Sequence, residues 1–334
     1  MRTNGPLVVC CPDSLKGALT AREAADALAS GIERAAGRAK RLPLADGGEG
    51  TADVLYAALG GEWRAARVSD PLGRPFRARF LLLPDGRAVV ESAEAVGLAR
   101  LRTDELDPLR TSSRGVGELV DAAVAAGASS VIVALGGSAT VDGGRGLHEV
   151  FDRLPVPVVA ACDVQNPLLG PRGAARAFGP QKGASPAEVE ELERRLAARD
   201  ELTPVAHLPG AGAAGGLGAA FAVLGATLVS GIDLVLQAVA FDDRVRGAAL
   251  VVTGEGAVDR SSLEGKTVAG VLRASGRVGV PCAVFGGRVE SAAARDLRAA
   301  GAATVCSLTG DRDRARGDLV ELGERLARSL GESA

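Results

Sequence analysis

Residues 7–36, LVVCCPDSLKGALTAREAADALASGIERAA, start the chain with a strand, a loop and a helix. Leu7–Cys11 is a continuous apolar run, which is typical of a strand buried in a parallel sheet. Thr20 and Glu23 form the T-x-x-E pattern of a capping box, which predicts a helix from there to about Ala36. The loop PDSLKG therefore follows a buried strand, where α/β proteins commonly bind ligands.

The last part of the chain repeats this alternation of strands and helices. Short apolar runs bounded by Gly or Pro indicate buried strands, and a segment of helical periodicity follows each of them. The predicted order is strand AALVVT (248–253), helix 262–274, strand VPCAVF (280–285), helix 291–300, strand ATVCSL (303–308) and helix 316–330.

From about residue 66 the regular alternation of predicted strands and helices is interrupted. Residues 74–92, RPFRARFLLLPDGRAVVES, predict an antiparallel hairpin that turns at Pro84-Asp85-Gly86. Ser185 and Glu188 form a second capping box, with Pro186 at the first helical position. The other predicted elements here and before it are a helix from about Glu49, helix 114–126, strand 130–135 and strand 156–164.

This order predicts an α/β protein of two domains. A chain of 334 residues suffices for two domains of the usual ~100–200 residues. We expect a discontinuous α/β domain from residues 1–65 and 270–334, with a mixed α/β domain, 66–269, inserted between its two parts.

Composition excludes several classes of protein. The 39 basic and 41 acidic residues give a net charge of −2, which lacks the basic footprint of nucleic-acid binding. Aromatic residues make up only 3%, so stacking platforms for single strands are not expected either. The apolar content of 47% excludes disorder and predicts a globular protein with a proper core.

Cysteine usage and the amino terminus favour the cytoplasm. The five cysteines are odd in number and lie mostly in apolar runs, which indicates free thiols in a reducing compartment. The first apolar run is too short for a secretory signal. Residues 208–232 carry no charge, but their seven Gly and many Ala favour a buried helix with close packing over a membrane span. We expect no membrane partner; the oligomeric state, monomer or homodimer, is left open.

Five segments combine Gly with carboxylates or Lys at the ends of predicted strands. Gly lets backbone N–H groups converge on an anion, and a carboxylate can hold Mg²⁺ or accept a hydroxyl proton. Lys occurs only four times among 39 basic residues, and three of the four lie in these segments. Together these are the parts required for phosphoryl transfer. The segments are 12–17 (PDSLKG), 45–51 (ADGGEGT), 136–144 (GGSATVDGG), 163–167 with 178–183 (FGPQKG), and 253–256 with 259 and 264–266.

Two standard nucleotide motifs fail. Glu264-Gly265-Lys266-Thr267 resembles the end of a P-loop, but the required earlier Gly is Arg260. Gly210-x-Gly212-x-x-Gly215 matches a dinucleotide fingerprint, but no strand precedes it, so close packing or a phosphate turn is the better interpretation.

The same segments resemble the bacterial-type glycerate kinase family, whose members phosphorylate D-glycerate with ATP. The resemblance covers nearly the whole chain in the same order. It implies a Rossmann-like domain made from both termini, an inserted mixed α/β domain, and an active site in the cleft between them. The seven motifs are PDSLKGALTAREAADALASGI, PLADGGEGT, VSDPLGRP, LGGSATVDGG, ACDVQNPLLGPRGAARAFGPQKGA, PGAGAAGGLGAA and TGEGAVDRSSLEGKT.

From the motifs we assign candidate roles, with ATP and Mg²⁺ as cofactors and D-glycerate as the small-molecule substrate. Which carboxylate is the base is left open, and Asp142 is either a site residue or a structural cap. Asn166 either binds a substrate hydroxyl or closes an Asx turn. The candidates are Lys16, Asp46, Asp163, Lys182 and Asp259 for catalysis; Gly136, Gly137, Ser138, Glu255 and Lys266 for nucleotide binding; Asp13, Ser14 and Asn166 for substrate binding; and Asp163 and Glu255 for the metal.

The chain departs from the family pattern at three motif positions. Val141 replaces the usual Asn, Leu15 replaces the usual Phe, and Glu264 replaces the His that commonly precedes the last Gly-Lys. The segment between Gly146 and Cys162 is also shorter than in typical members. The expected product is 2-phosphoglycerate. The alternatives are phosphorylation at the 3-hydroxyl, a catalytically silent relative that binds a small acid or nucleotide, and, least favoured, an oxidoreductase.

Overall fold

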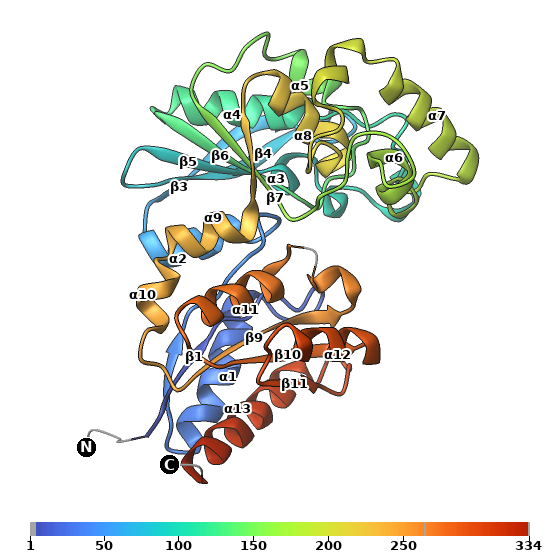
Figure 1. Cartoon of the computed structure of the whole chain (residues 1–334). Coiled ribbons are helices and arrows are strands. Elements are labelled where there is room, and N and C mark those ends of the chain that lie inside the picture. Colours follow the sequence, from blue (N-terminus) through green and yellow to red (C-terminus); the bar gives the residue numbers. More distant parts are fainter. Residues whose placement is uncertain (1–4, 264, 333–334) are drawn as a thin grey trace. The chain divides into compact units, whose positions relative to one another are not determined.

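The structure is a computed structural model that describes residues 5–263 and 265–332. The chain forms two compact units, shown in Figure 1. Unit 1 is drawn from Met1–Asp46 and Val235–Ala334, and unit 2 is the continuous segment Gly47–Leu234. The predicted fold class, a discontinuous α/β domain with a mixed α/β domain inserted in it, is confirmed.

The units divide at other residues than 65/66 and 269/270. Strand β9 (Leu250–Val258) runs parallel to β1 (Leu7–Cys10), with Val8 opposite Leu250, so it belongs to the sheet of unit 1. Strand β3 (Glu62–Ser69) pairs along its whole length with β4 (Pro75–Leu82), so its first residues belong to unit 2. The domain boundaries therefore follow strand pairing and not the change in sequence texture.

Unit 1 is built on a five-stranded parallel sheet of order β11-β10-β9-β1-β2. The inner strands β1, β9 and β10 are buried over most of their length because helices cover them, whereas the edge strand β2 reads Arg-Ala-Lys-Arg and is partly exposed. The two capping boxes predicted from sequence are present in the chain, the first of them at Thr20 and Glu23. The elements not yet given are α1 (Ala21–Arg34), β2 (Arg38–Arg41), α10 (Phe241–Val245), α11 (Thr267–Arg277), β10 (Cys282–Val289), α12 (Ser291–Ala299), β11 (Thr304–Ser307) and α13 (Ala315–Glu332).

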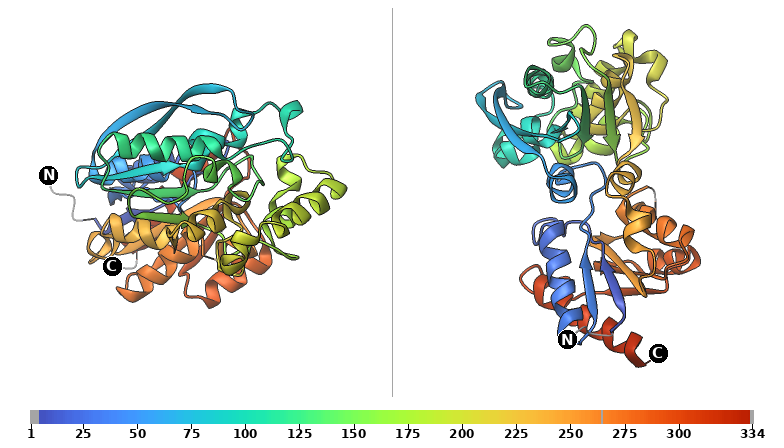
Figure 2. Two further views of the ribbon diagram at one scale, coloured as in Figure 1. Left: turned by 90° about the horizontal axis from the view of Figure 1, so that it is seen from above. Right: turned by 90° about the vertical axis from the view of Figure 1, so that its left-hand side faces the viewer.

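Helices α1 and α13 pack side by side in unit 1; Figure 1 labels both, and the right-hand view of Figure 2 shows them in blue and red from another side. Their contact is close because it is lined by Gly31 and Gly323. A Cβ placed on Gly31 would lie 2.0 Å from the Val320 carbonyl oxygen, and one on Gly323 would lie 2.3 Å from that of Leu28. Leu28, Ile32 and their neighbours on α1 and α13 form one core with side chains of β1, β9 and β10.

Unit 2 is built on a six-stranded mixed sheet of order β3-β4-β5-β6-β7-β8. The first two pairs are antiparallel and the remaining three are parallel. The predicted hairpin at residues 74–92 is confirmed, and so is the second capping box, at Ser185 and Glu188. The elements not yet given are α2 (Thr51–Leu59), β5 (Arg87–Glu91), α3 (Ser92–Val96), α4 (Arg114–Ala125), β6 (Ser130–Leu135), α5 (Arg145–His148), β7 (Val158–Cys162), α6 (Ala174–Phe178), α7 (Pro186–Ala197), α8 (Ala213–Val223), β8 (Thr227–Ser230) and α9 (Gly231–Ala238), which contains the boundary between the units.

Two predicted helices differ from the observed ones. Helix 262–274 was placed too early, because Arg260–Leu263 forms a separate 3-10 helix and α11 begins only at Thr267. The uncharged stretch 208–232 is not one helix; it contains α8 and then β8. No helix of the described chain combines the length and apolar character needed to cross a membrane.

The Gly210-x-Gly212-x-x-Gly215 match serves close packing in unit 2. A Cβ on Gly215 would lie 1.9 Å from the Thr140 carbonyl oxygen, and the Gly143 amide donates to the Gly215 carbonyl at 3.0 Å. The turn therefore packs directly against residues 140–143, as expected if these glycines serve close packing.

Candidate functional site

In unit 1, Asp13 lies just beyond the carboxyl end of β1. Its amide donates to the Gly254 carbonyl of the neighbouring strand β9 at 2.9 Å, which continues the strand pairing to this point. The carboxylate accepts from the Ser14 amide at 2.6 Å and from the Thr267 hydroxyl at 2.5 Å. Asp13 is thus held by β1, β9 and the first residue of α11, and its carboxylate has a fixed orientation.

The surroundings of Asp13 favour its protonated form. Loss of hydration and the nearby carboxylate of Asp46 raise the pKa of Asp13 from its ordinary value to about 7, against the opposing effect of the Thr267 hydroxyl. A carboxylate whose pKa lies near neutrality is suited to accept a proton at physiological pH. Sequence analysis assigned Asp13 to substrate binding; the structure adds the capacity of a general base.

Lys16 lies at the tip of a tight turn that directly follows Ser14. Leu15 and Leu19 pair with each other, and the Ala18 amide donates to the Leu15 carbonyl at 2.8 Å. Lys16 is exposed, and no hydrogen bond or ion pair to its ammonium group is present in the described chain. A hydrogen-bonded turn that presents a cation to solvent suits an anionic ligand.

Glu255 lies on β9 and directly follows Gly254, whose carbonyl accepts from the Asp13 amide. Loss of hydration raises the pKa of Glu255, with Asp46 and Asp259 acting in the same direction and the Ser262 hydroxyl and Lys266 opposing them. One carboxylate oxygen, Oε1, is buried and has no hydrogen-bond partner among the residues that the structure describes. Unit 1 therefore brings together Asp13, Asp46, Glu255, Asp259 and Lys266, which sequence analysis took from three separate segments.

In unit 2, the loop 136–144 leaves the carboxyl end of β6. Gly137 is exposed, whereas Ser138 is 2% exposed. The Leu98 amide donates to the Gly137 carbonyl at 2.9 Å, and the Ala139 amide donates to Val96 at 2.8 Å. These hydrogen bonds fix the backbone of residues 136–138, which the sequence predicts to bind the nucleotide.

Lys182 points into this loop and not toward solvent. The side chain is 3% exposed, and its Nζ donates to the Ser138 hydroxyl at 3.1 Å and to the Thr140 carbonyl at 2.7 Å. Burial lowers the pKa of Lys182 to about 7, although Asp142 acts in the opposite direction. Lys182 therefore supports the loop from within, and the catalytic role that the sequence assigned to it stays a prediction.

Asp142 has the geometry of a structural cap, one of the two roles left open. One carboxylate oxygen accepts from the Ser113 amide at 2.9 Å, the Ser113 hydroxyl at 2.8 Å and the Gly146 amide at 3.1 Å. The other accepts from the Gly144 amide at 3.0 Å. With four donors around it, Asp142 joins the end of the loop to the start of α4.

Asp163 and Asn166 follow β7 in unit 2. Asp163 directly follows the last residue of the strand, where its charge raises the pKa of the neighbouring Cys162 thiol after the larger effect of burial. The Asn166 amide donates to the Arg172 carbonyl at 2.7 Å. That bond closes the 166–172 loop, but it is not the Asx turn of the sequence interpretation, because the Leu168 amide donates to the Ala206 carbonyl at 2.8 Å. The contact of Asn166 with a substrate hydroxyl stays a prediction.

Two of the residues that depart from the family pattern are buried in hydrophobic cores. Val141 is 1% exposed and belongs to a core formed with side chains of α6, α7 and α8. Leu15 is 3% exposed and belongs to the core of unit 1. Glu264, the third departure, lies outside the described residues.

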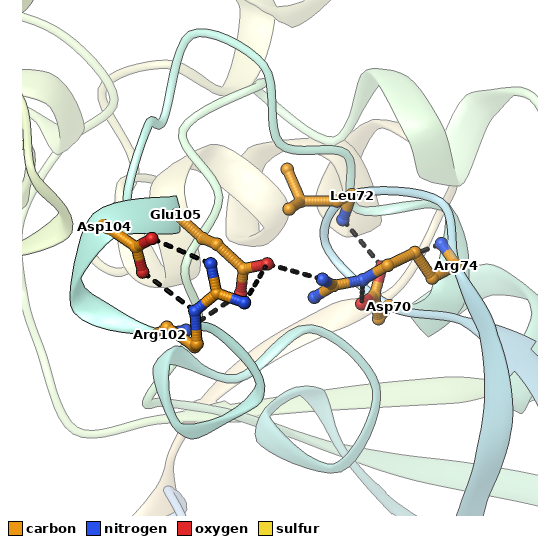
Figure 3. A network of polar contacts seen from close by, with 6 residues as sticks. All are labelled: Asp70, Leu72, Arg74, Arg102, Asp104 and Glu105. Carbon is orange, nitrogen blue, oxygen red and sulfur yellow. Dashed lines mark hydrogen bonds and ion pairs between the residues drawn. The ribbon is translucent and has the colours of Figure 1, made fainter.

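The VSDPLGRP motif forms a surface network in unit 2, shown in Figure 3. Asp70 accepts from the amides of Leu72 and Arg74, both at 2.8 Å, and pairs with the Arg74 guanidinium. Arg74 also pairs with Glu105 at 2.7 Å, which joins the turn to the 3-10 helix Thr103–Glu105. The Ser112 amide donates to the Pro71 carbonyl at 2.8 Å, so the motif helps to place the segment that Asp142 holds.

Sequence analysis missed Glu91 and Ser92 at the end of β5. They belong to a predicted strand, RAVVES, and have no Gly beside them, so they lacked the pattern used to select site segments. The available signal was a carboxylate and a hydroxyl directly after an apolar strand. Both are buried, and both bind loops of the candidate site, as described below.

The carboxylates fit Mg²⁺ only together with a phosphate ligand. No group of three or more His, Cys, Asp or Glu side chains in residues 5–263 and 265–332 has the arrangement of a metal site. Mg²⁺ needs only one or two carboxylates when substrate phosphates and water complete its shell. The unpartnered Oε1 of Glu255 meets that requirement in unit 1. Asp163, the other candidate ligand, belongs to unit 2.

Comparisons with known proteins agree with one another. A model described as the glycerate kinase family matches residues 8–153 and 147–330. The chain is 39% identical over 322 residues to a glycerate kinase of Halalkalibacterium halodurans, covering 84% of this chain and 85% of the relative. It is 40% identical over 306 residues to the glycerate 2-kinase of Escherichia coli K12, covering 79% and 80%. A crystal structure named for glycerate kinase 2 of Salmonella typhimurium LT2 aligns with a TM-score of 0.81 and 33% identity over 99% of both chains.

Proposed function

The chain belongs to the glycerate kinase family, and on that premise we propose that it transfers the γ-phosphoryl group of ATP to the 2-hydroxyl of D-glycerate. The products are 2-phosphoglycerate and ADP. The observation that carries the choice of hydroxyl is the 40% identity to the Escherichia coli protein named glycerate 2-kinase. Phosphorylation at the 3-hydroxyl is the alternative product.

The proposed roles follow the chemistry of each group. The Gly136 amide donates to the Ser92 hydroxyl, so the backbone N–H groups of Gly137 and Ser138 are the ones that bind phosphate oxygens. The Lys16 ammonium binds a phosphate or the glycerate carboxylate. A carboxylate of the unit 1 group, for which Asp13 has the best suited pKa, accepts the proton of the reacting hydroxyl. The glycerate oxygen then bonds to the γ-phosphorus as the bond from that phosphorus to the bridging oxygen of ADP breaks.

Mg²⁺ is part of this proposal. Glu255, and Asp163 as the second candidate, would hold the ion, which neutralises charge on the transferred phosphoryl group when it is bound. Lys266 and the Ser262 hydroxyl favour the ionised form of Glu255, against the larger effect of lost hydration, which raises its pKa. Asp46 and Asp259 supply further negative charge beside it.

The cytoplasm is the proposed location. The five cysteines form no disulfide in the described chain, and burial raises the pKa of four of their thiols, which makes those four unreactive. Such thiols are typical of a reducing compartment.

An assay of ADP release with ATP, Mg²⁺ and D-glycerate tests the proposal. Lys16→Ala is expected to lower kcat/KM by about 30-fold to 1000-fold, the usual effect of losing a charge-assisted contact to a transferring phosphoryl group. Lys40→Ala is the matched control, because the Lys40 ammonium donates to the Arg244 carbonyl at 3.0 Å and has no proposed role. Equal kcat/KM for the two variants would remove Lys16 from the site.

A further inference from the structure

Two consecutive side chains at the end of β5, Glu91 and Ser92, each hold a different loop of unit 2. Glu91 is 6% exposed and Ser92 is fully buried. Strand β5 lies inside the sheet, between β4 and β6, so its carboxyl end is a fixed point of the unit. Neither residue has a role in the function proposed above.

Glu91 caps helix α2 from outside that helix. The helix begins after Gly50, which has a φ of 92° and no side chain with which to cap it. The Glu91 carboxylate accepts from the amide of Ala52, the second helical residue, at 2.7 Å. It thus occupies the place of an N-cap side chain and puts a negative charge at the positive end of the helix dipole.

The chain just before α2 is thereby fixed as well. The Thr51 hydroxyl donates to the Gly48 carbonyl at 2.7 Å, which closes the turn of residues 47–51. Burial raises the pKa of Glu91 to about 7, with Asp53 and Glu94 adding to the increase, while the amides of Ala52 and Gly50 oppose it. At pH 8 the ionised form, which these amides stabilise, predominates.

Ser92 binds Gly136, the first residue of loop 136–144. Its hydroxyl donates to the Gly136 carbonyl at 3.0 Å and accepts from the Gly136 amide at 3.2 Å. One hydroxyl therefore satisfies both backbone groups of the residue at which loop 136–144 leaves β6.

The two loops also touch each other. A Cβ placed on Gly136 would lie 2.8 Å from the Gly48 Cα, and one on Gly137 would lie 3.7 Å from a Glu49 carboxylate oxygen. Residues 47–51 and 136–138 therefore form one surface, anchored below by two adjacent side chains of a single strand end.

We propose that Glu91 and Ser92 are positioning residues for the kinase reaction, because together they fix loops 47–51 and 136–138 against each other. We assign no substrate contact to either residue. They hold the backbone N–H groups of Gly137 and Ser138 in the orientation that the phosphates require, so that no reorganisation is needed during transfer. This inference rests on the proposed function for its catalytic consequence, but the anchoring itself does not depend on it.

Hydrogen exchange tests the anchoring. We would compare Glu91→Gln and Ser92→Ala with the wild type at pH 8, following peptides that cover residues 47–55 and 134–140. We expect exchange to be about tenfold faster or more in the peptide that each variant releases. Glu62→Gln is the matched control for Glu91, since its exposed carboxylate pairs with Arg64 at 2.7 Å and lies on β3, outside both loops. Ser129→Ala is the control for Ser92, since its hydroxyl donates to the Gly86 carbonyl at 3.2 Å, outside both loops. Both controls should exchange like the wild type.

Kinetics test the catalytic consequence. Both variants should lower kcat by about 10-fold to 100-fold, with a smaller change in the KM for D-glycerate, while the thermal midpoint stays well above the assay temperature. Exchange at the wild-type rate in both loops overturns the proposal, and so does faster exchange with kcat equal to that of the controls. A wild type without glycerate turnover would contradict only the proposed function, and the exchange comparison would still decide whether the pair anchors the loops.

Discussion

Burial raises the pKa of Asp13 and lowers the pKa of Lys182, so that both lie at about 7. Each is held by named hydrogen bonds, so each shift can be changed by a single substitution. The two residues belong to different units and therefore give independent tests of the site.

Removal of the Thr267 hydroxyl should move the acidic limb of the kcat/KM profile. Because the hydrogen bond from Thr267 lowers the pKa of Asp13, Thr267→Val should raise that pKa above its value of about 7. If the ionised Asp13 carboxylate accepts the proton, activity appears at higher pH in the variant than in the wild type. Thr267→Ser keeps a hydroxyl and should restore the wild-type profile. An acidic limb at the same pH in all three proteins would show that Asp13 is not the base.

Lys182 should make stability depend on pH in the alkaline range. In the folded protein the pKa of Lys182 is about 7, whereas in the unfolded chain it stays near its ordinary value of 10.5. Between these values the unfolded state binds more protons, so the free energy of unfolding rises with pH. Urea unfolding of wild type and Lys182→Met at pH 7 and pH 9.5 should show a difference that grows in favour of the wild type by a few kcal/mol, at about 1.4 kcal/mol per pKa unit. A difference that does not change with pH would contradict the burial of the ammonium group.

At the scale of the element, the contact between α1 and α13 depends on glycines that have no room for a side chain. Gly323→Ala should destabilise the protein by about 1–3 kcal/mol, because the added Cβ meets the backbone of α1 at Leu28. Gly317→Ala in the same helix meets nothing within 4 Å and should stabilise it by about 0.5–1 kcal/mol, through helix propensity alone. Thermal midpoints of the two variants should move in opposite directions. Shifts of the same sign would mean that the helices are not packed this closely.

The sequence predicted helix ends correctly where residues a few positions apart determine them. The capping boxes at Thr20 and Ser185 were found because three residues suffice to form each of them. Helix α11 was begun too early, because the periodicity does not reveal that Gly265, with a φ of 101°, separates the 3-10 helix from α11. Glu91 was missed because its partner, the Ala52 amide, lies 39 residues earlier in the chain.

The candidate site was predicted by segment but not by orientation. Gly-rich turns after strands located the loops that hold Asp13, Ser138 and Lys182. Nothing in the sequence indicated that the Lys182 ammonium is directed to Ser138 and Thr140 of its own unit. Such directions depend on tertiary contacts between residues more than 40 positions apart.

At the scale of the whole molecule, the order of elements predicted the nested arrangement of the two units. The boundaries were not predicted, because they depend on strand pairing between distant parts of the chain. Val8 lies opposite Leu250 in the sheet of unit 1, and no periodicity within either strand reveals that pairing. The seven collinear motifs were therefore the strongest signal for the fold, since they carry the order of the complete chain.

The central claim is phosphorylation of the 2-hydroxyl of D-glycerate with ATP as the donor. Its most direct measurement is a phosphorus NMR spectrum of the product formed from ATP, Mg²⁺ and D-glycerate, compared with authentic 2- and 3-phosphoglycerate. We predict a phosphomonoester signal that coincides with 2-phosphoglycerate and grows together with ADP. A signal of 3-phosphoglycerate would contradict the choice of hydroxyl, and an unchanged ATP spectrum from folded protein would contradict the kinase assignment itself.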